Sequence, residues 1–409
     1  MMASPKPLVL LVEPLFRGHH GVYVRWIVRG GIQRGYRFVL ATGRDNADHP
    51  MLQSLVKEFG SMLDISFFPE NKGTISAMLP SLMARDYAYF SLVKKTYREV
   101  SQVESPALVF LPYLDYCLYS MSLFGSPFGK TPWGGIAMRP GFHLKEMGIP
   151  APIFHGDWIK KCLFLRLLRN PTLVRLFVLD EGLATCIRKA DPKWAAQCRH
   201  VAEPAEMRGS LSKIAALKEL GIPDDAMVIL VYGDITLRKG LEALFMTMQE
   251  PSFPSHAHVI LAGLQDAEAK GFISSAAVQV LSQAGRLHLM DYYISPDCEY
   301  RIFAASDLLW LGYQQHNVMS GVLVQAGQMG LPVIGCEEGM IGWTIRNKQL
   351  GITIPMHDPR KVAIAIGELI QNQKQMNECG ENGRRAFSSH TPDQFARTIF
   401  DGIQAGRCL

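Results

Sequence analysis

Short apolar runs alternate with longer amphipathic segments along most of the chain, and this alternation predicts parallel strands joined by helices. The pattern is clearest between Leu308 and Gly335, where the runs LLWL and LPVIG enclose the segment VMSGVLVQAGQMG. Runs that are apolar on all sides are typical of buried parallel strands, and the enclosed segment is long enough for a helix. The stretch is therefore predicted to form one strand, helix, strand unit.

Apolar runs of the same kind recur in both halves of the chain. In the first half they are Leu8–Val12, Phe38–Ala41, Leu108–Leu111, Ile136–Met138 and Leu176–Leu179, and the section from Met51 to Val103 is predicted to be mostly helical. In the second half they are Met227–Tyr232, His258–Ala262, Leu287–Met290 and Asp307–Leu311, with predicted helices over Lys213–Leu220, from Leu241, and over Asp266–Ala284, Asp297–Ala305 and Arg360–Asn372. Such alternation indicates an α/β fold with doubly wound parallel sheets.

A polar run that contains a proline separates the two halves. Glu203–Ser210, EPAEMRGS, has the composition of a linker, and a new pattern of helix and strand begins after it. We therefore predict one Rossmann-like domain over residues 1–203 and a second over residues 204–389. The last segment, residues 390–409, is predicted to form a C-terminal helix from Pro392 to Gln404.

The loop Gln314–Ser320 lies between a predicted strand and the helix that follows it. In doubly wound sheets, ligands bind outside the carboxyl ends of the strands, so this loop is expected to face a ligand. The first backbone N–H groups of a helix have no partner inside the helix and carry partial positive charge. The sequence therefore predicts a site for an anion such as a diphosphate.

The stretch that follows this loop resembles the sugar-donor signature of GT-B glycosyltransferases, in particular the large retaining group often called family 4. The family pattern has a Glu, seven residues and a second Glu, within E-G-F-G-x-x-x-x-E-A-x-A-x-G-x-P-V-I. When Gly330 and Pro332–Ile334 are laid on its end, Gln325 falls on the second Glu and Asn317 on the first. Both family carboxylates are therefore amides in this chain.

A second motif resembles the same family. Gly233–Gly240, GDITLRKG, is similar to the loop G-R-L-x-x-x-K-G, in which an Arg and a Lys hold the diphosphate. Lys239 matches the Lys, but Asp234 stands at the position of the Arg, and we expect the adjacent Arg238 to take over its charge. The alternative is an ordinary solvated pair at a helix start, which the helix dipole opposes unless an anion lies between.

The resemblance implies a GT-B fold, in which two Rossmann-like domains face each other across a cleft and the C-terminal helix crosses back to the first domain. It implies a nucleotide-sugar co-substrate and no further cofactor. Fixed cations can stabilise the departing diphosphate without a metal, and the chain has no Asp-x-Asp pair of the kind that holds Mn²⁺ or Mg²⁺ in GT-A enzymes. Catalytic roles are expected for Lys239, Arg238 and Asn317, and substrate binding for Gly233, Tyr292, Ser320, Gly321, Val322 and Gln325.

The first domain offers further candidates just after its predicted strands. Gly18, His19, His20 and Gly21 open the first helix; this loop lacks the spacing of a dinucleotide fingerprint, and in the family the equivalent loop approaches the donor phosphates and the acceptor. The alternative for the two histidines is a surface pair without chemistry. Asp115 and Arg139 are candidate catalytic residues and His143 a candidate binding residue. The structural alternatives are a helix cap for Asp115, an anion clamp for Arg139 and a satisfied loop histidine for His143.

The net charge and the cysteines limit the partners and the cellular location that we expect. The formal net charge of +5 suits anionic substrates or an anionic membrane surface but is too small to indicate nucleic acid. The eight cysteines show no CxxC pair, which favours reduced thiols and a cytoplasmic location, and Leu8–Val12 is too short for a signal peptide or a membrane span. Ile159–Val178 is rich in Lys and Arg, so it is predicted to be either a peripheral contact with the inner face of a membrane or a core helix and strand with a basic rim.

The function that these observations predict is the transfer of a sugar from a nucleotide-diphosphate sugar to a glycan, lipid-linked or small-molecule acceptor. The resemblance implies retention at the anomeric carbon. The two amides at Asn317 and Gln325 leave a second hypothesis, a non-catalytic nucleotide-sugar-binding protein. A GT-B sugar-nucleotide epimerase or hydrolase is a third.

Overall fold

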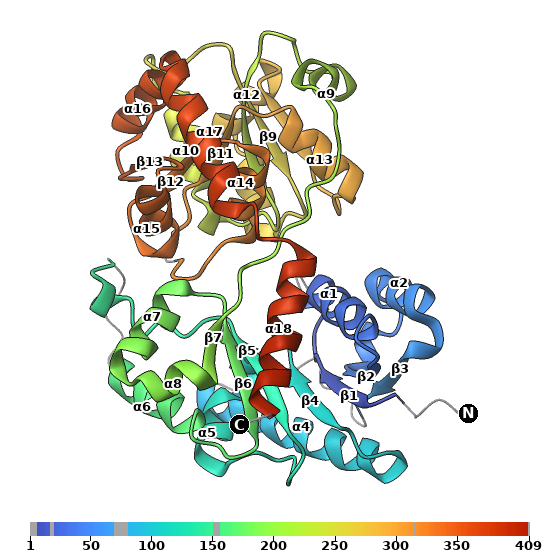
Figure 1. Ribbon diagram of the computed structural model, residues 1–409. Coiled ribbons are helices and arrows are strands. Elements are labelled where there is room, and N and C mark those ends of the chain that lie inside the picture. The colour runs from blue at the N-terminus through green and yellow to red at the C-terminus, as the bar shows by residue number, and fades with distance from the viewer. Residues whose placement is uncertain (1–5, 17–19, 69–80, 150–155, 315, 408–409) are drawn as a thin grey trace. The chain divides into compact units, whose positions relative to one another are not determined.

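The computed structural model describes residues 6–16, 20–68, 81–149, 156–314 and 316–407, and the chain divides into two compact units (Figure 1). Unit 1 comprises Met1–Met147, Ile153–Ala202 and Pro392–Leu409, and unit 2 comprises Gly148–Pro152 and Glu203–Thr391. Each unit contains one parallel sheet covered by helices. The predicted α/β class with two Rossmann-like sheets is confirmed.

The sheet of unit 1 has seven strands in the order β3-β2-β1-β4-β5-β6-β7, and every pair is parallel. The strands are β1 (Leu8–Val12), β2 (Arg37–Thr42), β3 (Leu63–Phe67), β4 (Leu108–Leu111), β5 (Trp133–Ala137), β6 (Leu173–Val178) and β7 (Cys198–His200). The chain begins in the middle of the sheet, fills one edge and then returns to fill the other. The carboxyl ends of β1, β4 and β5 are therefore neighbours although they lie far apart in sequence.

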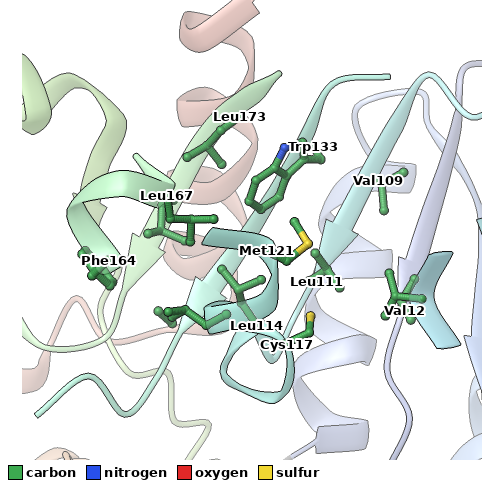
Figure 2. Packing of buried hydrophobic residues seen from close by; sticks show 14 of the residues in the cluster. Val12, Val109, Leu111, Leu114, Cys117, Met121, Trp133, Phe164, Leu167 and Leu173 are labelled. Atoms are coloured by element: carbon green, nitrogen blue, oxygen red, sulfur yellow. The ribbon is translucent and has the colours of Figure 1, made fainter. Parts of the chain in front are cut away.

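Helices cover both faces of this sheet. They are α1 (His20–Ile32), α2 (Pro50–Phe59), α4 (Leu82–Val103), α5 (Leu118–Phe124), α6 (Asp157–Leu167), α7 (Glu181–Ala190), α8 (Pro192–Gln197) and α18 (Pro392–Arg407). Figure 2 shows the core on one face, where Val109 and Trp133 of the strands pack with Met121 of α5 and Phe164 of α6. Trp133 is fully buried. The apolar runs of the strands thus form the core, as their composition predicts.

The last helix, α18, packs in unit 1 against α1 and β6 (Figure 1). Its apolar face, with Phe395 and Phe400, joins the core on the other face of the sheet. Glycine allows the close packing, because a Cβ at Gly30 would lie 2.3 Å from the Cβ of Ala396. Gly30 and Ala396, which are 366 positions apart in the chain (396 − 30), therefore lie in close contact.

The sheet of unit 2 has six strands in the order β10-β9-β8-β11-β12-β13, again all parallel. The strands are β8 (Met227–Tyr232), β9 (Ala257–Ala262), β10 (Leu287–Met290), β11 (Leu308–Leu311), β12 (Val333–Cys336) and β13 (Gly351–Ile354). The helices are α9 (Lys213–Leu220), α10 (Leu241–Met248), α11 (Ala267–Ile273), α12 (Ala276–Gln283), α13 (Pro296–Ala304), α14 (Gly321–Met329), α15 (Gly339–Lys348), α16 (Pro359–Gln371) and α17 (Gln373–Phe387). The predicted strand, helix, strand unit is β11, α14 and β12.

The described part of the section Met51–Val103 is mostly helical, as predicted, and it also contains the edge strand β3, whose residues are mostly half-buried and so show no continuous apolar run. One local prediction was wrong. The single helix expected over Asp266–Ala284 is two helices, because Ser275 has an extended backbone (ψ 150°).

The basic stretch Ile159–Val178 is divided between α6 and the buried strand β6. Arg175 lies in this strand, is 6% exposed and donates from Nε to the carbonyl oxygen of Gly402 in α18. Because Arg175 is part of the core, the stretch does not form one continuous basic face. Its second half follows the alternative prediction of a core strand.

Candidate functional site

Glycines let the loops at the carboxyl edge of the unit 2 sheet pack backbone against backbone. Gly240 has φ 73°, and a Cβ there would lie 2.2 Å from the carbonyl oxygen of Gly312, just after β11. Gly263, just after β9, has φ 133°, and its Cβ would lie 2.0 Å from the carbonyl oxygen of Gly233. Only glycine accepts both the backbone conformation and the close approach. The loops after β8, β9 and β11 therefore meet at one place.

Lys239 lies at this place, in a single helical turn of three residues, Leu237–Lys239. The side chain is 5% exposed, and its Nζ donates to the carbonyl oxygen of Tyr232 at 2.6 Å and to the hydroxyl of Tyr313 at 2.7 Å. Both partners are neutral, and no acidic side chain in the described part of the chain forms an ion pair with Lys239. A buried ammonium without a counter-ion is unfavourable, so the site is electrostatically prepared for an anion.

Two further hydrogen bonds fix the segment that carries the cations. The indole Nε1 of Trp310 donates to the carbonyl oxygen of Lys239 at 2.9 Å, and the amide of Gln314 donates to the carbonyl oxygen of Arg238 at 2.8 Å. Trp310 belongs to β11, which neighbours β8 in the sheet. The positions of both cations are therefore set by the sheet and not by the loop alone.

Arg238 shares a neighbour with Lys239. Its guanidinium lies 5.7 Å from the ring centroid of Tyr313, and Nζ of Lys239 lies 4.6 Å from the same centroid. The Nη1 atom of Arg238 is 2.7 Å from Nδ1 of His316. The side chain of Arg238 is exposed, whereas that of Lys239 is buried. The two cations thus flank Tyr313, and the side chain of Arg238 is accessible to a ligand.

The amino terminus of α14 borders the same space. A Cβ on Gly233 would lie 3.4 Å from Nζ of Lys239 and 4.0 Å from Cγ2 of Val322. Ser320 occupies the N-cap position, and its hydroxyl makes no capping hydrogen bond. The helix start therefore presents backbone amides next to the buried cation, as an anion site requires.

Asn317 lies in the loop before α14, close to the start of α15. A Cβ on Gly339, whose φ is 68°, would lie 2.3 Å from the carbonyl oxygen of His316 and 3.3 Å from Oδ1 of Asn317. The side chain of Asn317 is half-buried. The loops that precede α14 and α15 therefore touch, and Asn317 lies at the contact.

Gln325, one turn into α14, is bound to a carboxylate that no sequence motif indicated. Its Nε2 donates to Oε1 of Glu299 at 2.7 Å, and the hydroxyl of Tyr232 donates to the same oxygen. Burial raises the pKa of the Glu299 carboxyl, and these two hydrogen bonds partly offset the shift. Glu299 belongs to α13, where the sequence reads as an ordinary amphipathic helix, so only the packing of α13 on α14 reveals the pair.

Tyr292 lies at the edge of the sheet, after β10. Its side chain is 49% exposed. The preceding Asp291 accepts a hydrogen bond from the amide of Gln265 at 2.9 Å and pairs with Lys270 at 2.8 Å. These contacts fix the loop and leave the ring of Tyr292 accessible, which is compatible with the predicted contact to a nucleotide base.

In unit 1, rings and charges gather at the carboxyl ends of β1 and β4. Nδ1 of His20 lies 3.0 Å from Oε1 of Glu13, a carboxylate that is 1% exposed. The imidazole stacks on Tyr113 with ring centroids 4.6 Å apart, and Tyr113 stacks on Tyr116 at 4.8 Å. Burial and the nearby charge of Glu13 raise the pKa of Tyr116. Glu13 was not predicted, because a single Glu after a strand carries no motif.

Asp115 and Arg139 lie near the same rings and charges of unit 1, beside Tyr113. The Asp115 carboxylate accepts hydrogen bonds from the amides of Met138 at 2.7 Å and Arg139 at 2.8 Å, which hold the turn after β5. Burial raises the pKa of Asp115, whereas these hydrogen bonds lower it. The exposed guanidinium of Arg139 lies 5.3 Å from the ring centroid of Tyr113. Asp115 therefore braces a loop, and Arg139 is presented at its surface.

The remaining candidates of unit 1 lie apart from a ligand surface or outside the described residues. His143 is 1% exposed, and its Nε2 is 2.6 Å from Oδ2 of Asp180, the N-cap of α7. His143 is therefore a buried histidine paired with a carboxylate, and its Nδ1 has no hydrogen-bond partner among the described residues. Gly21 is buried in α1, where a Cβ would lie 2.5 Å from Cγ of Met51. Gly18 and His19 lie outside the described residues.

The described residues contain neither a cluster of metal ligands nor a membrane-spanning helix. No group of three or more His, Cys, Asp or Glu side chains in these parts of the chain is arranged to hold a metal ion. None of the described helices is both long enough and apolar enough to cross a membrane.

Comparison with known proteins agrees with the geometry of unit 2. Residues 226–372 match the family described as Glycosyl transferases group 1. Over 207 residues, 46% of this chain, the sequence is 23% identical to D-inositol 3-phosphate glycosyltransferase 2 of Catenulispora acidiphila. The match covers 47% of that relative, so the chain spans about half the length of the curated protein that it matches.

Similar solved structures extend the likeness to both units. The Anabaena protein HepE in complex with UDP and glucose has a TM-score of 0.68 at 13% identity, with 98% of this chain and 100% of that chain covered. Sucrose-phosphate synthase from Thermosynechococcus elongatus has a TM-score of 0.69 at 15% identity and covers 98% of each chain. WaaG, a glycosyltransferase involved in lipopolysaccharide biosynthesis, has a TM-score of 0.64 at 14% identity, with 97% and 99% covered. These likenesses establish the GT-B fold.

Proposed function

We propose that the protein is a glycosyltransferase that moves a sugar from a nucleotide-diphosphate sugar to an acceptor hydroxyl. The observation that carries the proposal is the buried ammonium of Lys239, which has only neutral partners in the described structure and lies beside the start of α14. A diphosphate would supply the missing negative charge. The match of residues 226–372 to the group 1 family supports this interpretation.

The reaction requires stabilisation of a leaving group. The bond between the anomeric carbon and the β-phosphate oxygen breaks, and its electron pair leaves with the nucleoside diphosphate. Lys239, Arg238 and the first amides of α14 lie where they would stabilise that charge, so we assign the step to fixed cations without a metal. The acceptor oxygen forms the new bond and loses its proton. Retention of configuration is proposed from the family resemblance alone.

The acceptor and the nucleotide base are further parts of the proposal. HepE is described in complex with UDP and glucose, which makes a UDP-sugar the first donor to test. We assign the acceptor to the ring and charge group of unit 1, where His20, Tyr113 and Arg139 lie together. A stack of rings beside a cation suits a sugar or another polyhydroxyl acceptor.

A second candidate is a non-catalytic protein that binds nucleotide sugars. It is favoured by the amides at Asn317 and Gln325, which carry no charge where the family motif has carboxylates. Measuring binding and hydrolysis or transfer with UDP-, GDP- and ADP-sugars separates the two. Release of free nucleoside diphosphate in the presence of an acceptor supports the transferase, tight binding with no release or isomerisation supports the binder, and isomerised sugar nucleotide indicates an epimerase.

The Asn317→Ala variant is expected to lower kcat by about tenfold or more while changing KM by less than about threefold, because an amide next to the reacting sugar acts on charge that develops in the transition state. Steady-state kinetics with the active sugar nucleotide measures both. If Asn317→Glu instead raised the turnover of a nearly inactive native protein, the native chain would be a binder that has lost a catalytic carboxylate.

We further propose a peripheral contact with anionic membranes through the start of α6. Trp158 is 70% exposed and Ile159 46% exposed, and Lys160 and Lys161 follow them directly. Exposed apolar side chains next to cations are typical of surfaces that bind the membrane interface.

The protein is therefore expected to co-sediment with vesicles that contain phosphatidylglycerol at low salt and to be released at high salt, since screening weakens surface electrostatics. Exchange of Trp158 and Ile159 for serine should reduce the bound fraction severalfold. Vesicles of neutral lipid are the control. An unchanged bound fraction in this double variant would show that α6 is not the contact.

A further inference from the structure

A carboxylate from α13 lies directly beside the amide of α14 that replaces a family carboxylate. Gln325 Nε2 is 2.7 Å from Oε1 of Glu299, and the hydroxyl of Tyr232 donates to the same oxygen. An ionised carboxylate only accepts hydrogen bonds, so the amide nitrogen of Gln325 must face Glu299 and its carbonyl oxygen must face away. The pair therefore has a fixed orientation.

This arrangement leaves two acceptor oxygens without a protein partner among the described residues, Oε2 of Glu299 and Oε1 of Gln325. One residue links them to the anion site, because Tyr232 binds Glu299 through its hydroxyl at the end of the side chain and Lys239 through its backbone carbonyl oxygen. In a nucleoside diphosphate the ribose diol lies next to the phosphates. Its two hydroxyl groups are donors that need two neighbouring acceptors.

We propose that Glu299 supplies the carboxylate that binds the ribose hydroxyls of the nucleotide, together with the amide oxygen of Gln325. This inference rests on the proposed function. A carboxylate at position 325 would lie against the carboxylate of Glu299, and two like charges in contact are unfavourable. An amide at Gln325 satisfies Glu299 with a hydrogen bond and avoids that repulsion. Compared with the family motif, the negative charge is on α13 and not on α14, and the site still contains one carboxylate.

The test compares nucleotides with and without a ribose hydroxyl. Isothermal titration of the full chain with UDP and 2′-deoxy-UDP, and with the corresponding GDP and ADP pairs, gives the ribose preference as a ratio of Kd values. For the native protein we expect a ratio of about tenfold or more, as a hydrogen bond to a charged acceptor predicts. In Glu299→Gln the ratio should fall to about threefold or less, because the acceptor becomes neutral. Loss of a merely structural hydrogen bond would weaken both nucleotides equally and leave the ratio unchanged.

A reciprocal exchange completes the test. Gln325→Glu alone places two carboxylates together and should weaken binding, whereas Glu299→Gln combined with Gln325→Glu returns the charge to α14 and should restore the ratio. Glu219→Gln is the matched control, because Glu219 pairs with Arg301 of the same helix α13. An unchanged ratio in Glu299→Gln, with UDP still bound, overturns the role of Glu299 alone. Failure of the native protein to bind any of the six nucleotides overturns the proposed function as well.

Discussion

Replacing Lys239 with methionine is expected to weaken the binding of UDP by about 10- to 100-fold, because each hydrogen bond between charged groups is worth about 1.5 to 3 kcal/mol. Methionine keeps the length and the apolar stem of lysine and removes only the charge. The variant that also carries Arg238→Ala should lose several kcal/mol in total. Calorimetric titration with UDP, and with GDP and ADP in parallel, measures the loss.

Two controls separate this effect from a loss of structure. Lys361→Met removes a cation of α16 whose side chain is 70% exposed and pairs with Asp358, and should leave binding unchanged. The buried ammonium of Lys239 has no acidic partner in the described structure, so Lys239→Met should unfold at no lower temperature than the native protein. Addition of EDTA should not alter binding. Undiminished affinity in the Arg238 and Lys239 double variant, or an absolute requirement for Mn²⁺, would contradict the assignment.

Replacing Gly240 with alanine is expected to destabilise the protein by about 3 kcal/mol or more and to abolish nucleotide binding. A left-handed backbone costs a residue with a Cβ about 1 to 2 kcal/mol, and the added Cβ would also lie 2.2 Å from the carbonyl oxygen of Gly312. Relief of that contact must move the turn that carries Lys239. Urea unfolding followed by fluorescence measures the stability, and titration with UDP measures the binding.

Gly221 offers a matched control for this variant. It has φ 68° and ψ 29°, nearly the conformation of Gly240 at 73° and 34°, but a Cβ there would meet no atom within 4 Å. Gly221→Ala should therefore cost only the backbone term of about 1 to 2 kcal/mol and leave binding unchanged. Equal losses of stability in the two variants would show that the approach of Gly240 to Gly312 is not tight.

The sequence by itself determined the class of fold and predicted the place of the candidate site. The apolar runs of unit 2 predicted the inner strands β8, β9 and β11, since a strand covered on both faces must be apolar throughout. Lys239 and the loop before α14 could be named because the residues of each motif lie close together in the chain. Their position at the carboxyl edge of the sheet follows from the topology of parallel strands.

Only the tertiary structure revealed the strand at the edge of a sheet and the contacts between residues that are distant in sequence. The strand β3 lies at the edge of its sheet, so its residues need not be apolar and give no signal. The sequence left open whether Arg175 is a surface cation. In the structure it is part of the core, because β6 lies inside the sheet and α18 covers it. The contact between His143 and Asp180 likewise depends on the fold, because the two residues belong to separate segments of the chain.

The pairing of Glu299 with Gln325 shows most clearly why the sequence alone does not predict the charges of a site. The two residues lie on different helices, and neither position alone indicates a charge at the site. A sequence motif records which residue occupies one position of a helix, whereas the electrostatics of a site depend on every side chain that reaches it. The residues of α14 supply no carboxylate at Gln325, whereas the packing of α13 on α14 places the carboxylate of Glu299 beside it.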